Sequence, residues 1–187
     1  GLEGTYTVTV PTAAEDTYFV TENITTTVSG ELTADTPSSL RDPHNHADYL
    51  IISPLHLMES AQRLAEYRTA QGLETMLVDS EDVYDEFSNS VAAPEAVRDF
   101  LAYIHANWAK VPQYVVLAGD GSYDYKNYLG AGWPQVPTVL TATPEGYFPS
   151  DNVLADVVGD DGVPEFALGR IPAVDNDEFA VYIDKLI

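Results

Sequence analysis

The chain contains no cysteine, and only eight of its 187 residues are lysine or arginine, against 30 that are aspartate or glutamate. The absence of cysteine excludes a disulfide framework, thiolate metal ligands and a cysteine nucleophile from this chain. A formal charge of -22 repels the phosphates of nucleic acids and anionic lipid surfaces. Nucleic acid is therefore excluded as a partner, and the acidic surface fits simple solubility, a saline habitat or cation binding.

Long apolar runs and phosphate-binding motifs are also missing. No apolar run approaches the ~18 residues of a membrane-spanning helix, so we expect no membrane span. No basic segment followed by an apolar stretch opens the chain, and we expect any secretion signal upstream of Gly1. The turn Gly119-Asp120-Gly121-Ser122 lacks the full glycine fingerprint and a P-loop lysine. A receiver-like or nucleotide-binding domain is therefore disfavoured.

Composition divides the chain into three segments. Residues 1–32 are rich in threonine, valine and tyrosine, and the stretch from Tyr6 to Val10 alternates with the period of a half-buried strand. Residues 33–47 contain Pro37, Pro43 and several small polar residues, which is typical of a linker. We expect a β-rich segment that ends an upstream domain or edges the main sheet (1–32), a linker (33–47) and a main unit (48–187).

The main unit alternates between strand and helix patterns. Apolar runs predict strands at 48–53, 74–79, 114–120 and 166–170, with a possible further strand at 136–140. Apolar residues at spacings of three and four predict helices from Leu57 to about Gly72 and over 81–87, 94–108 and 175–186. This order predicts an α/β fold, with a parallel sheet of about four strands and helices on both faces.

Several residues mark the expected helix ends. Pro94 suits a first helical position, and Gly72 suits the left-handed residue that ends a helix. Ser80 can cap the helix that follows it, and Asp175 with Glu178 forms a start resembling a capping box. The last helical pattern continues to the final residue, so we expect the native polypeptide to run on and treat the chain as a fragment.

Eight strings from Asp48 onward resemble one protein family in their order and spacing. They are Asp48–Ile52, Leu64–Arg68 with Gly72–Leu73, Val78–Phe87, Pro94–Leu101, Leu117–Asp124, Ser150–Asn152, Gly159–Gly162 and Gly169–Pro172. This pattern resembles the gingipain-like cysteine peptidases, secreted bacterial enzymes of the caspase-like clan. In that family two α/β subdomains lie side by side, and the second supplies the catalytic cysteine and a histidine in a Gly-His-Gly-like turn.

The chain resembles only the first subdomain, because it has no cysteine and no Gly-His-Gly. The resemblance implies a secreted (extracellular or cell-surface) endopeptidase whose catalytic subdomain follows in the same polypeptide and whose substrates are peptides or proteins. The fragment alone should be inactive. The alternative is a non-catalytic relative, a binding or secretion-associated module on the same scaffold. The sequence beyond Ile187 would separate these two hypotheses.

Acidic residues are the candidate metal ligands. Asp79 and Asp120 each end a predicted strand at the carboxyl edge of the sheet, where they can hold a divalent cation or cap the following turn or helix. A second group crowds one glycine-containing stretch and consists of Asp151, Asp156, Asp160 and Asp161. The spacing does not match an EF-hand, but gingipain-like peptidases bind calcium. The calcium (Ca²⁺) candidates are Asp120, Asp151, Asp160 and Asp161.

Two other groups carry weaker hypotheses. His44 and His46 lie two residues apart in the predicted linker and form either a loose zinc site or part of an exposed polar segment. Aromatic residues gather in the long loop before residue 136 and either line a peptide groove or pack beneath the loop. They are Tyr123, Tyr125, Tyr128 and Trp133.

Overall fold

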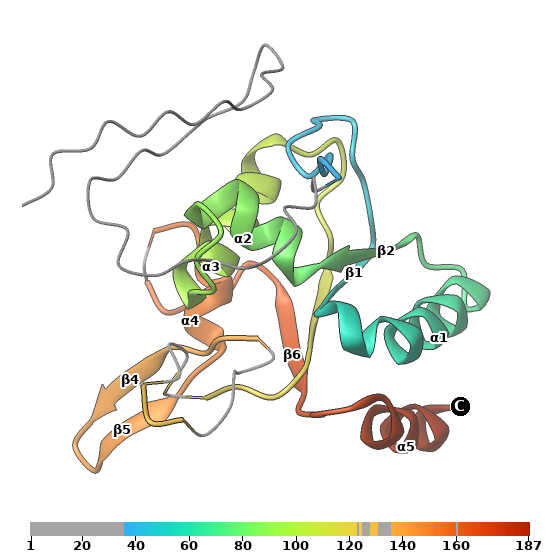
Figure 1. Ribbon diagram of the computed structural model, residues 1–187. Helices are drawn as coiled ribbons and strands as arrows, with labels where there is room; N and C mark the ends of the chain where they lie inside the picture. The colour runs from blue at the N-terminus through green and yellow to red at the C-terminus, as the bar shows by residue number, and fades with distance from the viewer. Residues whose placement is uncertain (1–35, 123, 125–127, 131–135, 160) are drawn as a thin grey trace, which may run out of the picture. The chain divides into compact units, whose positions relative to one another are not determined.

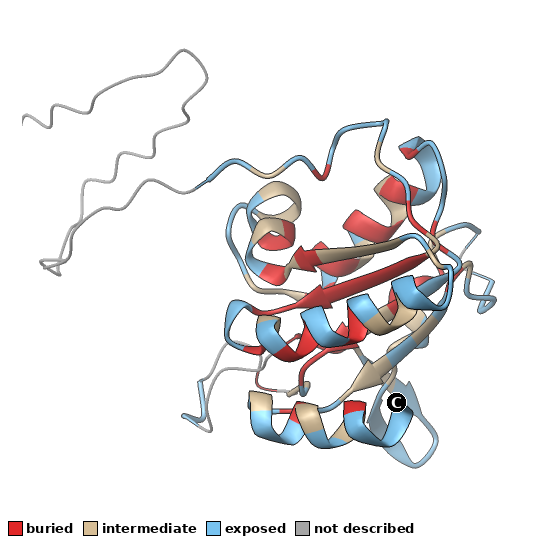
Figure 2. Ribbon diagram, turned by 90° about the vertical axis from the view of Figure 1, so that its right-hand side faces the viewer, coloured by how far each residue is buried: buried red, intermediate tan, exposed pale blue. Residues whose placement is uncertain are grey.

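Two strands that are apolar on both faces form the centre of the molecule. The computed structural model describes residues 36–122, 124, 128–130, 136–159 and 161–187. In strand β1 (Tyr49–Ser53) all five residues are buried, and β3 (Tyr114–Ala118) pairs with it in parallel. A continuous apolar run is what a strand covered on both faces requires. Figure 2 shows the buried residues concentrated on these strands and on the helix surfaces turned toward them.

The parallel sheet has the strand order β2-β1-β3-β6. Strand β2 (Thr75–Asp79) pairs with β1, and β6 (Ala167–Ile171) pairs with β3, both in parallel. Each parallel connection has to cross back over the sheet, and helices make these crossovers. The prediction of an α/β fold with about four parallel strands is therefore confirmed, and Figure 1 shows helices on either side of the sheet.

One face of the sheet is covered by α1 (Met58–Ala70) and α5 (Asn176–Leu186). Ile51 of β1 packs there with Leu64 of α1 and Phe179 of α5, all completely buried. The short 3-10 turn η1 (Leu55–Leu57) precedes α1 and adds Leu57 to the same cluster. The two helices also contact each other directly. The first and last α-helices of the described residues thus share one layer.

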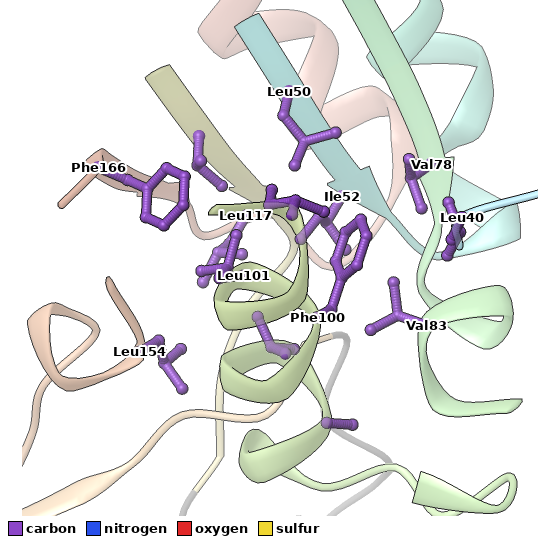
Figure 3. Packing of buried hydrophobic residues seen from close by; sticks show 14 of the residues in the cluster. Leu40, Leu50, Ile52, Val78, Val83, Phe100, Leu101, Leu117, Leu154 and Phe166 are labelled. Carbon is purple, nitrogen blue, oxygen red and sulfur yellow. The ribbon is translucent and has the colours of Figure 1, made fainter. Parts of the chain in front are cut away.

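The opposite face is covered by α2 (Ser80–Ser88), α3 (Pro94–Asn107) and the single turn α4 (Asn152–Ala155). Phe100 and Leu101 of α3 point from the helix toward Ile52 of β1 (Figure 3). Trp108 stands edge-on against Phe100, with ring centroids 5.9 Å apart. Alternate residues of β1 thus fill two separate cores, as the period of a strand dictates. No helix among the described residues is long and apolar enough to cross a membrane.

The helix ends follow from local hydrogen bonding. Asp79 is the N-cap of α2 and accepts a hydrogen bond from the Glu81 N–H, so the predicted cap at Ser80 is wrong by one residue. Asp175 caps α5 by accepting from the Glu178 N–H at 2.8 Å, as predicted. Pro94 occupies the first turn of α3. Satisfying these otherwise unpaired N–H groups fixes where each helix leaves its preceding strand.

A β-hairpin occupies the region where the sequence predicted one strand. Strands β4 (Leu140–Thr143) and β5 (Gly146–Pro149) pair antiparallel as a separate two-stranded sheet. The predicted strand at 136–140 is therefore wrong in position. Residues 136–138 are instead buried, and the carbonyl groups of Val136 and Pro137 accept hydrogen bonds from the Arg170 side chain. Pro137 has no N–H to donate to a sheet ladder, which argues against a strand there.

Residues 36–47, part of the predicted linker, pack against the α/β unit. Leu40 is 3% exposed, and its carbonyl accepts a hydrogen bond from the Trp108 indole N–H. The Arg41 guanidinium lies 4.2 Å from the centroid of the Phe87 ring and forms an ion pair with Glu86. This segment therefore contributes to the core beside α2 and α3. Residues 33–35 and the predicted β-rich segment 1–32 lie outside the described residues.

A charged cluster joins the amino ends of β1 and β2. The Lys110 ammonium lies 2.7 Å from Asp48 and 2.6 Å from Glu74. The hydrogen bond from Lys110, and then that from the Glu74 N–H, lowers the pKa of the Asp48 carboxyl below its ordinary value. The same two carboxylates raise the pKa of Lys110.

The two leucines Leu40 and Leu55 provide a matched pair for testing the packed segment. We expect Leu40→Ala to lower the free energy of unfolding by about 2–4 kcal/mol, because it leaves a cavity in the core. Leu55→Ala, at a side chain 71% exposed, should change it by less than about 0.5 kcal/mol. Urea unfolding followed by circular dichroism measures both. Equal effects would show that Leu40 does not belong to the core.

The cluster at Asp48 should make stability depend on acid. Because folding lowers the Asp48 pKa, the interaction stabilises the folded protein above the ordinary aspartate pKa, near 3.9. This contribution is lost as the pH falls through the lowered pKa. We therefore expect Asp48→Asn to flatten the fall in melting temperature between about pH 5 and 3. An unchanged acid profile for the variant at low salt would contradict this role.

Candidate functional site

The carboxyl edge of the sheet is where the fold can form a site. The chain passes from β1 outward to β2 and later returns to β3 on the other side of β1, so the order reverses between β1 and β3. Open α/β sheets bind ligands outside the carboxyl ends of the strands at such a point. Here β1 ends at Ser53, which is fully buried, and β3 ends at Ala118. Gly119 and the described residues that follow it leave β3 at this edge.

Arg170, near the end of β6, holds that loop in place. Its Nε and Nη2 donate to the two carboxylate oxygens of Asp151, each at 2.8 Å. Its Nη1 donates to the carbonyl oxygens of Gly119 and Val136, and Nη2 donates at 3.4 Å to that of Pro137. These five hydrogen bonds equal the five N–H donors of a guanidinium group. Arg170 is therefore a structural hub with no donor left for a substrate anion.

Asp151 is the acidic partner in this hub. Its Oδ1 also accepts a hydrogen bond from the Thr138 hydroxyl at 3.0 Å. The side chains of Arg170 and Asp151 are only 12% and 22% exposed, so the bidentate pair is largely shielded from water. Asp151 lies between β5 and α4, and its contacts therefore tie the hairpin's root to the sheet. Its predicted role as a calcium ligand competes with these bonds.

The Gly-Asp-Gly turn after β3 has a geometric explanation. Gly119 has a φ of +132°, which side-chain-bearing residues rarely adopt. A Cβ on Gly121 would lie 3.2 Å from Thr138, so a larger residue would crowd the hub. The Asp120 carboxylate accepts a hydrogen bond from the Gly121 N–H and is otherwise exposed. The absence of a side chain at Gly121 thus lets the turn after β3 pass close to Thr138.

Two buried hydroxyl groups lie on the first turns of α2, directly after β2. Ser80 is 1% exposed and Tyr84 is 3% exposed, and the two residues lie one helical turn apart on α2. Burial, the largest influence, raises the pKa of Tyr84 far above its ordinary value. Tyr84 is therefore a neutral phenol at any physiological pH and is unsuited to act as a base.

No hydrogen bond in the described part of the chain pairs a histidine ring with an acidic or nucleophilic side chain at this edge. The His44 ring donates to the Asp42 carboxylate at 2.8 Å, and the His46 ring donates to the His44 carbonyl at 3.0 Å, both in the exposed segment before β1. The His105 ring packs edge-on against Phe166. His56 is exposed in η1, where its carbonyl oxygen accepts from Asn176.

The calcium candidates fall at different places in the structure. Asp120 is exposed after β3, and Asp151 is paired with Arg170. The Asp161 carboxylate accepts from the Val163 N–H, and Asp160 lies outside the described residues. Within residues 36–187, gaps excepted, no three acidic or histidine side chains come together in a way that could hold a metal ion. Calcium binding stays a prediction.

The turn between α4 and β6 is held by carboxylates of its own. Asp156 is 7% exposed, and one of its oxygens accepts a hydrogen bond from the Gly162 N–H at 2.8 Å. The Glu165 carboxylate accepts from the N–H groups of Val157 and Val158. These acidic residues therefore organise backbone locally. Of the predicted aromatic cluster, Tyr128 is 82% exposed, and the other three members lie outside the described residues.

Arg170 belongs to one of the strings that resemble the gingipain family, but no role was predicted for it from the sequence. An arginine inside an otherwise apolar strand was the available signal, in a chain with only eight basic residues. Its partners lie 19 to 51 residues away along the chain. Those partners could not be identified from spacing alone.

Removing the hub should destabilise the protein more than removing an exposed ion pair. We expect Arg170→Met to lower the free energy of unfolding by about 2–4 kcal/mol, because Asp151 and three carbonyl groups lose their partner. Arg63→Met is the matched control, since its bond to Asp184 is exposed and should contribute less than about 1 kcal/mol. Urea unfolding measures both. Comparable losses would show that Arg170 is not a hub.

Comparison with solved structures finds a similar fold in a larger protein. The chain matches the crystal structure of dimeric latent PorU from Porphyromonas gingivalis with 25% sequence identity and a TM-score of 0.61. The match covers 76% of this chain but only 15% of the PorU chain. A search of the curated proteins finds no match.

Comparison with family models identifies the unit just described. The model of peptidase family C25 matches residues 42–187, which begin in the segment beside the core and include the whole parallel sheet. The PorU match agrees with this assignment at the level of the fold. The chain belongs to peptidase family C25.

Proposed function

We propose that this chain is the first, non-nucleophilic subdomain of a gingipain-like cysteine endopeptidase. The observation that carries the proposal is the C25 match over residues 42–187, in a chain that contains no cysteine at all. A cysteine peptidase needs a thiolate nucleophile beside an imidazole base. The proposal therefore assigns the nucleophile and its histidine to a catalytic subdomain elsewhere in the same polypeptide.

The role of this subdomain is to support its partner. The hydrogen-bonding groups at the carboxyl edge are largely occupied in holding loops, through Arg170, Asp151 and Asp124, whose carboxylate accepts from two backbone N–H groups. A scaffold of this kind can position a neighbouring subdomain and one wall of a substrate cleft. Peptide-bond hydrolysis would then pass through an acyl-enzyme formed on the partner's sulfur. Secretion and calcium binding belong to the same proposal.

A non-catalytic binding or secretion-associated module is the second candidate. The same absence of cysteine favours it if the continuation also lacks a thiol and a Gly-His-Gly turn. The sequence of the polypeptide after Ile187 separates the two candidates before any assay.

The decisive assay compares the 187-residue chain with the chain extended by its natural continuation. We expect no hydrolysis of fluorogenic peptides by the short chain. The extended protein should hydrolyse them under reducing conditions and lose this activity after treatment with iodoacetamide, because the alkylated sulfur cannot attack a carbonyl.

Replacement of the continuation's cysteine by alanine provides the control for nonspecific alkylation. Hydrolysis by the short chain would contradict the proposal, as would activity of the extended protein that survives alkylation. A folded extended protein without any activity would favour the binding module.

A further inference from the structure

Strand β2 forms one edge of the parallel sheet, and β1 is its only strand partner among the described residues. The Glu74 carbonyl oxygen faces β1, where it accepts hydrogen bonds from the N–H groups of Asp48 and Tyr49. Main-chain groups of successive strand residues point to alternate sides. Thr75 and Leu77 therefore direct their N–H and C=O groups away from the sheet, toward the open edge.

Apart from its length of five residues and the Asp79 at its end, this edge lacks the features that usually prevent pairing with another chain. Proteins protect sheet edges with lysine, proline, bulges or a covering segment. The strand Thr75-Met76-Leu77-Val78-Asp79 contains no lysine or proline and keeps an unbroken register with β1. No described segment pairs with its outer side. The edge therefore presents hydrogen-bonding groups in the pattern that an added strand requires.

A groove runs beside the open edge, between β2 and α1. It has a volume of about 560 Å³. Its helix wall consists of residues at spacings of three and four, and its strand wall consists of Thr75 and Leu77. The helix residues are Gln62, Ala65, Glu66, Thr69 and Ala70. The small side chains leave room for a branched apolar side chain. The residues that offer free main-chain groups therefore also line the space where a bound strand would place alternate side chains.

The charge of the groove determines the kind of segment that fits. Glu66 lines it, with one oxygen accepting a hydrogen bond from Gln62, and no lysine or arginine is among the lining residues. The whole chain carries a formal charge of -22. An acidic segment would be repelled, and a segment with basic residues beside its apolar ones would be attracted.

We propose that the open edge of β2 is a binding site for an extended peptide segment with alternating apolar residues and basic ends, which adds as a fifth strand to the sheet. The main chain of the segment bonds to Thr75 and Leu77, and one apolar side chain enters the groove against Ala70. The site lies at the strand edge of the fold, away from the loops that Arg170 organises. Its existence does not depend on the proposed peptidase function.

The test uses the 187-residue chain labelled with nitrogen-15 and a synthetic peptide, acetyl-Lys-Thr-Val-Thr-Val-Lys-amide. We expect saturable shifts of the amide resonances of β2 and of the last two turns of α1. A second peptide carries N-methyl groups on both valines. It keeps the charge and side chains but loses two N–H donors, so we expect it to bind about tenfold more weakly or worse.

Ala70→Trp fills the groove and should weaken binding of the unmodified peptide by about tenfold. Ala106→Trp is the matched control, because Ala106 is likewise an exposed alanine in the last turn of a helix, on α3. It should leave the affinity unchanged. Both variants are checked for an unchanged amide spectrum outside the substituted turn.

Three results would overturn the proposal. The first is the absence of saturable shifts at millimolar peptide. The second is equal binding of the N-methylated peptide, which would indicate attraction of a basic peptide to an acidic surface without strand addition. The third is a set of shifts centred away from β2. If Ala70→Trp fails to fold, the N-methylated peptide still decides between strand addition and charge alone.

Discussion

The guanidinium group of Arg170 determines how the carboxyl edge of the sheet is closed. Its donors reach the end of β3, the buried segment before the hairpin and the carboxylate of Asp151. A lysine ammonium could satisfy only part of this set, because it has three donors and no planar fork for a bidentate carboxylate. One side chain on the neighbouring strand therefore joins Gly119 and Val136, the described residues near the two ends of the loop after β3.

The parallel sheet explains why this contact occurs where it does. Every parallel crossover returns the chain to the same edge, so all four strands deliver their following loops to one side of the molecule. Burial of β1 on both faces leaves that edge as a place where polar side chains can meet. At this edge Asp79 caps the start of α2, and Ser80 and Tyr84 lie on the same helix. The helix cap at Asp79 and the hydrogen bonds of Arg170 thus lie at the same edge, because all four parallel strands end there.

Much of this fold could be predicted because the signals are local. Continuous apolar runs indicated β1, β2, β3 and β6, and the spacing of Phe100, Leu101 and Ile104 indicated α3. The β4–β5 hairpin could not be placed, since each of its strands is only four residues long and almost entirely exposed. Leu40 was predicted to lie in a linker, because the polar residues around it give no sign in the sequence that this one side chain is buried. Arg170 and Asp151 required knowledge of contacts between distant segments.

The carboxyl edge of the sheet and the β2 edge differ in whether their hydrogen-bonding groups have internal partners, and this difference bears on function. At the carboxyl edge, internal partners already occupy the donors of Arg170 and the carboxylates of Asp124 and Asp151. The proposed cysteine-peptidase chemistry would require a thiolate, which this chain does not contain. At the β2 edge, main-chain groups remain without a described partner. Recognition through main-chain hydrogen bonds requires no special side chains. The proposed strand addition would therefore let this chain bind polypeptide without a nucleophile of its own.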